Sequence, residues 1–202
     1  MDGASLSRRS LLHAIAATIA TAAVPFDWAD VVHAMDQGHG AAPPDGIAKI
    51  SLLGAADAAD IEAVAAQIVP SDDSPGAREA GVIFFIDRAL ATSFSRLAGD
   101  YRAHLAAFQA GYRERHPGAA SFASLTAEQQ IDHLNSIEQT PFFTTTRLLT
   151  LLGMFSLPAY GGNRDDIGWK LIGFEDRHVF SPPFGYYDRD YPGFVVDPPK
   201  NR

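Results

Sequence analysis

A stripe of apolar side chains in the middle of the chain constrains the fold more than any other feature. Between residues 94 and 112 these side chains recur at steps of three and four, which is the spacing of one face of an α-helix. The stripe consists of Phe94, Leu97, Tyr101, Leu105, Phe108 and Tyr112. The run His116-Pro117-Gly118 follows, and proline and glycine end helices. We therefore expect a long helix that buries an aromatic face.

Two helices are expected before this stripe. Asp57 is expected to cap the first, whose apolar face runs to Ile68 and which Pro70 ends. Ser74 followed by Pro75 is a favourable N-cap and first-turn pair, and it predicts the start of the second. The apolar residues of the second helix are Val82, Ile83, Ile86, Ala89 and Leu90. Both segments have the helical period.

Two more helices are expected after the stripe. Thr126 and Gln129 have the spacing of a capping box, and the helix that follows is expected to face inward with Ile131, Leu134 and Ile137. Pro141 is placed in the opening turn of a helix that carries Phe142 and the later leucines. No segment alternates with period two for long. The sequence thus predicts an all-α protein with one small domain of about five helices, spanning residues 47–157.

The amino-acid composition excludes several kinds of site. The chain of 202 residues has no cysteine, which excludes disulfides, iron–sulfur ligation, zinc sites that need cysteine and covalent c-type haem attachment. Its formal net charge is −8. A negative chain is poorly suited to nucleic acid, because phosphate groups repel it. We therefore expect no nucleic-acid partner.

Twin arginines near the N-terminus predict an export signal. Arg8 and Arg9 precede a leucine pair and an Ala/Thr-rich stretch, which is typical of the Tat route for folded cargo. The apolar part, residues 14–24, is shorter than the roughly 20 residues that span a bilayer. Residues 1–34 are therefore interpreted as a Tat signal peptide, with cleavage after Ala34; cleavage at the competing site near Ala23 and an uncleaved leader are the alternatives. Residues 35–46 are interpreted as a linker, and the Tat translocase and the periplasm are the expected partner and destination.

The C-terminal part, residues 158–202, has no period but many aromatic residues. Aromatic side chains and arginine are enriched in the buried centres of protein interfaces. We therefore predict an extended, irregular docking arm, with packing back onto the helices as the alternative. The candidate partner-binding residues are Trp169, Phe174, Phe184, Tyr186, Tyr187 and Tyr191.

Few residues fall in patterns that are typical of catalytic, cofactor-binding or metal-binding sites. Glu175 and His178 form one Glu-x-x-His pair, whereas a di-iron bundle needs two such pairs. The nucleophile-elbow and dinucleotide-binding glycine patterns do not occur, and Asp132-His133 is interpreted as a solvated helix face. We therefore assign no catalytic, cofactor-binding or metal-binding residue. A periplasmic enzyme with a metal at Glu175 and His178 and a small-ligand-binding helical protein remain the alternatives.

Two separated motifs resemble those of the gluconate 2-dehydrogenase subunit 3 family. The first motif, residues 68–87, consists of IVP at 68–70, an aspartate at 72 or 73, PGAREAGV at 75–82 and FID at 85–87. The second motif, residues 142–174, consists of FF at 142–143, Arg147, LT at 149–150, Gly153, YGGN at 160–163 and GWKLIGF at 168–174. The resemblance covers nearly all of the chain after the linker.

The resemblance implies a noncatalytic small subunit of a membrane-associated dehydrogenase that oxidises a sugar, a polyol or an aldonate. The partner would be a flavoprotein of the glucose-methanol-choline oxidoreductase type that holds FAD. A multihaem cytochrome c subunit with haem c would take the electrons. In such complexes the small subunit carries the Tat signal for both proteins, so we expect it in the periplasm, at the inner membrane through the complex.

Overall fold

The computed structural model describes residues 49–176, and within this range it contains helices and turns without a strand. The helices are α3 (Ala55–Ile68), α4 (Val82–Ala91), α5 (Ala98–Arg115), α6 (Ala127–Ile137), α7 (Pro141–Phe155) and α8 (Ile167–Ile172). Short 3-10 turns are η1 (Ser95–Leu97), η2 (Phe122–Ser124), η3 (Pro158–Tyr160) and η4 (Arg164–Asp166). The prediction of an all-α domain is confirmed.

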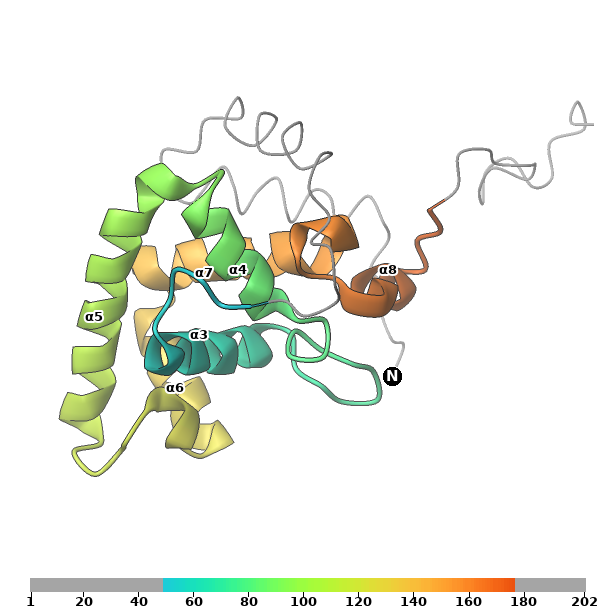
Figure 1. The fold of residues 1–202 in the computed structure, drawn as a ribbon. Helices are drawn as coiled ribbons and strands as arrows, with labels where there is room; N and C mark the ends of the chain where they lie inside the picture. The colour runs from blue at the N-terminus through green and yellow to red at the C-terminus, as the bar shows by residue number, and fades with distance from the viewer. Residues whose placement is uncertain (1–48, 177–202) are drawn as a thin grey trace, which may run out of the picture.

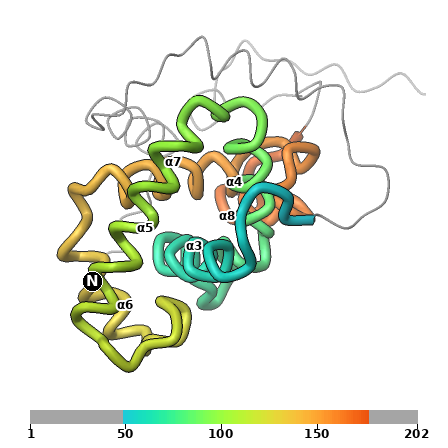
Figure 2. Tube along the Cα trace, turned by 60° about the vertical axis from the view of Figure 1, so that its left-hand side comes forward, coloured from blue at the N-terminus to red at the C-terminus, as the bar shows by residue number. Residues whose placement is uncertain are grey.

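Helix α3 lies in the middle of the domain. It contacts α4, α6, α7 and η2, and Figure 2 shows it surrounded by these elements. Helix α5 forms one edge and packs across α7, while α8 lies at the opposite end of α7 (Figure 1). The most deeply buried aliphatic residues come from α3, α4 and α7 and include Ile61, Val64, Ile86 and Leu149. These three helices form the core on which the others pack.

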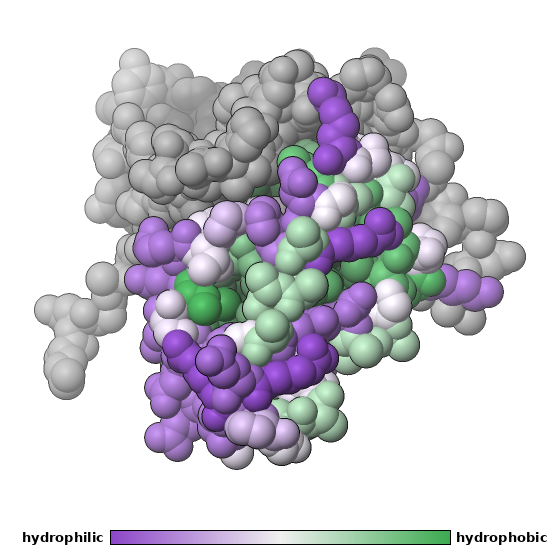
Figure 3. All heavy atoms as spheres, turned by 90° about the vertical axis from the view of Figure 1, so that its left-hand side faces the viewer, coloured by the Kyte–Doolittle hydropathy of each residue, from purple (hydrophilic) through white to green (hydrophobic). Residues whose placement is uncertain are grey.

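The predicted aromatic stripe lies on the buried face of α5. Tyr101, Leu105, Phe108 and Tyr112 are buried, and the ring of Phe108 stacks on Phe142 of α7 with 4.4 Å between centroids. Phe94 is also buried, but it precedes α5 and η1 separates them. The outward face of α5 combines hydrophilic residues with alanines (Figure 3). The helix therefore begins later than its apolar period indicates.

A buried carboxylate on α3, that of Asp60, connects this helix with α5 and η2. The oxygens of Asp60 on α3 accept hydrogen bonds from Phe122 N at 2.8 Å, Tyr112 Oη at 3.1 Å and Gln109 Nε2 at 3.1 Å. The Asp60 side chain is almost completely buried. A buried charge is tolerated when hydrogen bonds replace its hydration, so Asp60 fixes α5 and η2 against α3.

A second buried carboxylate holds the segment that precedes α3. Asp87 on α4 accepts hydrogen bonds from the backbone N–H groups of Ser51, Leu52 and Leu53 at 2.7–2.9 Å, and from the Ser51 hydroxyl. Burial alone would raise the pKa of Asp87, but these hydrogen bonds outweigh it and lower the pKa below its ordinary value. The carboxylate thus fixes where the chain enters the domain.

Two predicted helix starts are wrong. α3 begins after Gly54, and Asp57 lies in its first turn, where its carboxylate accepts a hydrogen bond from Gln109 at 2.9 Å. α4 does not begin at Ser74 and Pro75, because its first residue is Val82. The intervening residues form a loop in which Glu79 accepts hydrogen bonds from Ser71 and Gly76.

The start of α6 is as predicted, and its buried face is as predicted in part. Thr126 and Gln129 form the capping box, with hydrogen bonds of 3.0 and 3.3 Å. Leu134 is buried and Ile137 packs against the core, as predicted, but Ile131 is 46% exposed, and Gln130 and His133 are buried beside Leu134 instead. The Gln130 amide causes this rotation, because it donates to the carbonyl oxygens of Phe122 and Leu125. Pro141 opens α7 as predicted.

Candidate docking surfaces

The chain after α7 folds onto the end of that helix. The sequence indicated an irregular arm from residue 158, but η3, η4 and α8 follow, and α8 packs on α7. The packed domain therefore continues past residue 157, to Phe174. Sequence periodicity missed α8 because it has only 6 residues, fewer than two turns.

Side chains from this segment satisfy the last carbonyl groups of α7. Trp169 Nε1 donates to Phe155 O at 2.9 Å, and Asn163 Nδ2 donates to Ser156 O at 2.9 Å. The Asn163 oxygen in turn accepts from Gly168 N at 2.8 Å. A helix leaves its final carbonyl groups without intrahelical partners, so these contacts cap α7. We call the packing of residues 161–169 on the C-terminal end of α7 the α7–α8 joint.

Glycines allow the two segments of the joint to touch backbone to backbone. A Cβ atom at Gly162 would lie 2.2 Å from Gly153 O, and one at Gly168 would lie 1.8 Å from Met154 O. Both distances are far below van der Waals contact, and the atoms met are backbone. Only glycine fits at these two positions.

The joint also brings the two sequence motifs together. Arg164 N donates to Ala80 O at 3.0 Å, and the Arg164 guanidinium lies 5.5 Å from the centroid of the Phe84 ring. Gly81, with φ of 68°, leaves room for this guanidinium, since a Cβ atom there would lie 3.0 Å from Arg164 Nη2. Much of the resemblance noted in the sequence therefore describes one packed region.

An apolar groove lies on the outside of the joint. It has a volume of about 360 Å³ and is lined by Phe155, Ser156, Leu157, Tyr160, Trp169, Ile172 and Phe174. α8 ends at Gly173, where Phe174 N bonds to Trp169 O at 2.8 Å and the chain turns back. This turn sets the Phe174 ring against Trp169, with 5.2 Å between centroids. We call this hollow the α7–α8 groove.

Exposed apolar side chains gather at the α7–α8 groove. Leu157 and Phe174, which line this groove, are 39% and 44% exposed. They are two of the four large apolar residues that are exposed within residues 49–176, and a third, Leu171 of α8, is not among the lining residues. Exposed apolar surface of this kind makes the groove a candidate binding site.

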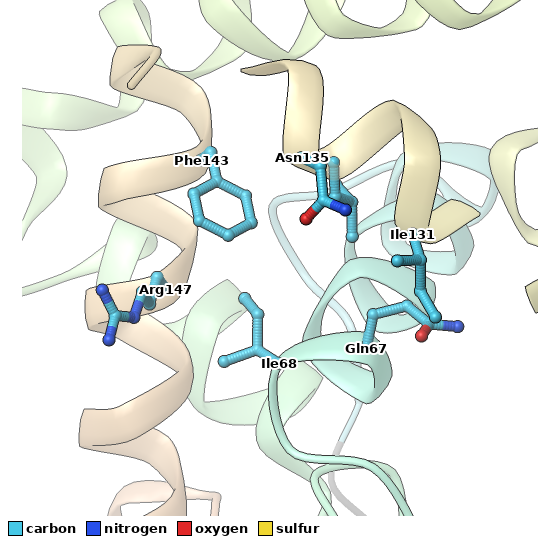
Figure 4. Close-up of a pocket in the computed structure, with 7 residues that line it drawn as sticks. Gln67, Ile68, Ile131, Asn135, Phe143 and Arg147 are labelled. Atoms are coloured by element: carbon cyan, nitrogen blue, oxygen red, sulfur yellow. The ribbon is translucent and has the colours of Figure 1, made fainter. Parts of the chain in front are cut away.

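A second, more polar groove lies between α3, α6 and α7 (Figure 4). Its volume is about 250 Å³, and its lining residues are Gln67, Ile68, Ile131, Leu134, Asn135, Phe143 and Arg147. The fourth exposed apolar residue, Ile131, belongs to this groove. We call it the α3–α6–α7 groove. Three of the four large apolar residues exposed in the described part of the chain thus line a groove.

The structure places two of the predicted partner-binding residues. Trp169 is only 8% exposed and packs within the joint, so the prediction of an extended, irregular arm is wrong at this residue. Phe174 lies at the surface, on the rim of the α7–α8 groove. Whether either contacts a partner stays a prediction. The other candidates lie outside the described residues: Phe184, Tyr186, Tyr187, Tyr191 and the export arginines Arg8 and Arg9.

The described residues bring together no group of metal ligands. Within residues 49–176 no three histidine, aspartate or glutamate side chains are placed to hold a metal ion. Glu175 lies in this range, whereas its possible co-ligand His178 lies outside it. In the same range no helix is both long enough and apolar enough to cross a bilayer.

His133 is a feature that sequence reasoning missed. It was interpreted as part of a solvated helix face, yet it is only 2% exposed, and its ring packs against Phe108 with 5.4 Å between centroids. Neither ring nitrogen has a hydrogen-bond partner. Burial, with smaller effects from Arg115 and His116, lowers the pKa of His133, so the neutral form is favoured. No signal in the sequence distinguished this position from an exposed one.

Taken together, the fold and its surface define a small helical protein whose exposed apolar residues are concentrated at two grooves. A sequence model of the gluconate 2-dehydrogenase subunit 3 family matches residues 55–176, more than half of the chain. The chain therefore belongs to this family. Comparison with curated proteins and with solved structures gives no match.

Proposed function

We propose that this chain is the noncatalytic small subunit of a dehydrogenase complex that oxidises a sugar, a polyol or gluconate. Family membership supports a role as a subunit of such a complex. The catalytic partner is a flavoprotein of the glucose-methanol-choline oxidoreductase type, which holds FAD. A multihaem cytochrome c subunit with haem c accepts the electrons.

The α7–α8 groove is the observation that carries this proposal. It presents Leu157 and Phe174 to solvent around an apolar hollow. Burying such side chains against a partner is favourable by about 25 cal/mol for each Å² removed from water. The close-packed joint beneath keeps the groove in a fixed shape, which lowers the entropic cost of binding. The flavoprotein docks here and is stabilised by mass action, because the subunit binds only its native state.

Export is the second part of the proposed function. Arg8 and Arg9 direct the assembled pair of proteins to the Tat translocase, and the complex functions in the periplasm at the inner membrane. Docking precedes transport in this scheme, so replacing both arginines by lysine should leave the partner in the cytoplasm. Arrival of the flavoprotein in the periplasm with the lysine variant would contradict shared export.

Co-purification with the flavoprotein subunit tests the docking site. The variant Leu157→Ser should reduce the recovered flavoprotein at least fivefold, because the Leu157 side chain lines the α7–α8 groove. Ile131→Ser is the control, since Ile131 is also exposed, at 46% against 39% for Leu157, and lies away from this groove. Equal recovery with both variants would move the interface away from the α7–α8 groove.

A further inference from the structure

The α3–α6–α7 groove combines an apolar floor with polar groups at its edges. Ile68, Leu134 and Phe143 supply apolar surface, and Ile131 adds an exposed apolar side chain at the rim. Figure 4 shows the Phe143 ring and the Asn135 carboxamide pointing into the opening. The lining therefore differs in kind from the α7–α8 groove, where the side chains are almost entirely apolar.

A positively charged side chain, that of Arg147, lies beside this groove. Arg147 is exposed, and Figure 4 shows its aliphatic stem at the groove and its guanidinium turned outward. Within residues 49–176 the structure contains an ion pair between Arg78 and Glu62 and none at Arg147. A rotation of this long, exposed side chain would bring its fork of donors over the groove, where it would suit a carboxylate.

We infer that the α3–α6–α7 groove binds an extended peptide segment of a second protein, with an apolar side chain on its floor and a carboxylate at Arg147. The Asn135 carboxamide both donates and accepts hydrogen bonds, as a peptide backbone requires. A volume of about 250 Å³ fits a few side chains.

The two grooves are separate, so both sites can be filled at once. Phe143 and Phe155 lie 12 positions apart on α7, which corresponds to about 18 Å along the helix. An acidic, apolar segment at one end of α7 leaves the α7–α8 groove free for the flavoprotein. The chain would then bridge two proteins.

A titration followed by ¹H–¹⁵N NMR tests this inference on the full chain without the flavoprotein. The probe is the capped peptide acetyl-Gly-Ile-Val-Asp-Gly-amide. It should shift the side-chain resonances of Gln67, Asn135 and Arg147 in a saturable manner. The same peptide with Asn in place of Asp should bind at least fivefold more weakly. Because no flavoprotein is present, the result is independent of docking at the α7–α8 groove.

Variants and a simple anion complete the test. Arg147→Glu should weaken binding of the Asp peptide at least tenfold, while Arg96→Glu, the same charge change in η1, should leave it unaltered. Asn135→Ala should weaken both peptides. Equal binding of both peptides, the same shifts with sodium acetate alone, or shifts confined to α8 would each overturn the inference. So would the absence of any shift at millimolar peptide.

Discussion

The two ends of α7 are held to the domain by different kinds of contact. At its C-terminal end, Trp169 and Asn163 pair with backbone carbonyl groups, and Gly168 lets two backbones touch. At its N-terminal end, Phe142 packs in a cluster of aromatic rings from α5, η2 and α6. That cluster encloses His133, whose ring nitrogens have no partner. The first end is specified by hydrogen bonds and close fit. The second is held mainly by apolar packing, with one buried hydrogen bond between Tyr101 of α5 and Thr146 of α7 at 2.9 Å.

This difference predicts which parts of the domain tolerate substitutions. A backbone contact without room for a Cβ atom has one arrangement, so the joint should respond sharply to small substitutions. An aromatic cluster can repack, but an unsatisfied polar group inside it costs free energy. We therefore expect the joint to set the geometry of the α7–α8 groove, and the aromatic cluster to set the pH dependence of stability.

The largest effect is expected for Gly168→Ala, which tests the close fit of the joint. The new methyl group would overlap Met154 O, so the joint must separate, at a cost of about 3 kcal/mol in free energy of unfolding. Urea denaturation measures this. Gly99→Ala is the control, because Gly99 has open space around it and alanine favours the helix. If both variants are as stable as the wild type, the joint is not close-packed.

A smaller effect is expected for Trp169→Phe, which separates hydrogen bonding from packing in the joint. Phenylalanine keeps most of the apolar contact but leaves Phe155 O without its indole donor, which should cost about 2 kcal/mol. The comparison is Leu171→Ala, at an exposed position of the same helix, where a change within about 0.5 kcal/mol is expected. A loss as small as that of Leu171→Ala would mean that the indole N–H does not cap α7.

The buried His133, near the N-terminal end of α7, predicts that the stability of the fold depends on pH. The pKa of His133 is lowered from its ordinary 6.5, so the unfolded chain binds more protons than the folded chain below that pH. Stability should be greatest above pH 6.5 and fall as the pH drops, by up to about 1.4 kcal/mol per pH unit. Asp87 and Glu79 have lowered pKa values, so their contribution is lost only at more acidic pH, below about 4.5.

The variant His133→Leu tests whether His133 causes the loss of stability at low pH. It removes the titrating group and fills the aromatic cluster with an apolar side chain, so the decline between pH 6.5 and 5.5 should flatten and stability at pH 7.5 should rise by about 1 kcal/mol. His104→Leu, on the half-buried side of α5, is the histidine control and should keep the decline. A slope unchanged by His133→Leu would refute the role of the buried imidazole.

The sequence predicted the elements whose signals are local. The period of the α5 stripe, the capping box of Thr126 and Gln129, and Pro141 at the start of α7 all depend on residues within a few positions of one another. α8 could not be found this way, since residues with positive φ, Asp165 and Asp166, lead into a helix too short for a period.

The candidate sites were harder to predict because their partners are distant in sequence. Trp169 is buried because a carbonyl group 14 residues away accepts its N–H. The rotation of α6 that exposes Ile131 and buries His133 depends on Gln130 and two carbonyl groups near η2. Both faces of α6 fit a helical period, so only tertiary contacts decide between them. The family motifs indicated the joint region without revealing that it is one structure.

Hydrogen–deuterium exchange of the chain, alone and in complex with the flavoprotein, tests the central claim most directly. If the α7–α8 groove is the docking surface, complex formation should slow exchange of the backbone amides of Leu157, Ala159 and Tyr160 and of those from Leu171 to Phe174. Amides on the outward face of α5, such as that of Ala106, should exchange as before. Protection confined to α5 or to the α3–α6–α7 groove, with residues 157–174 unchanged, would contradict the account.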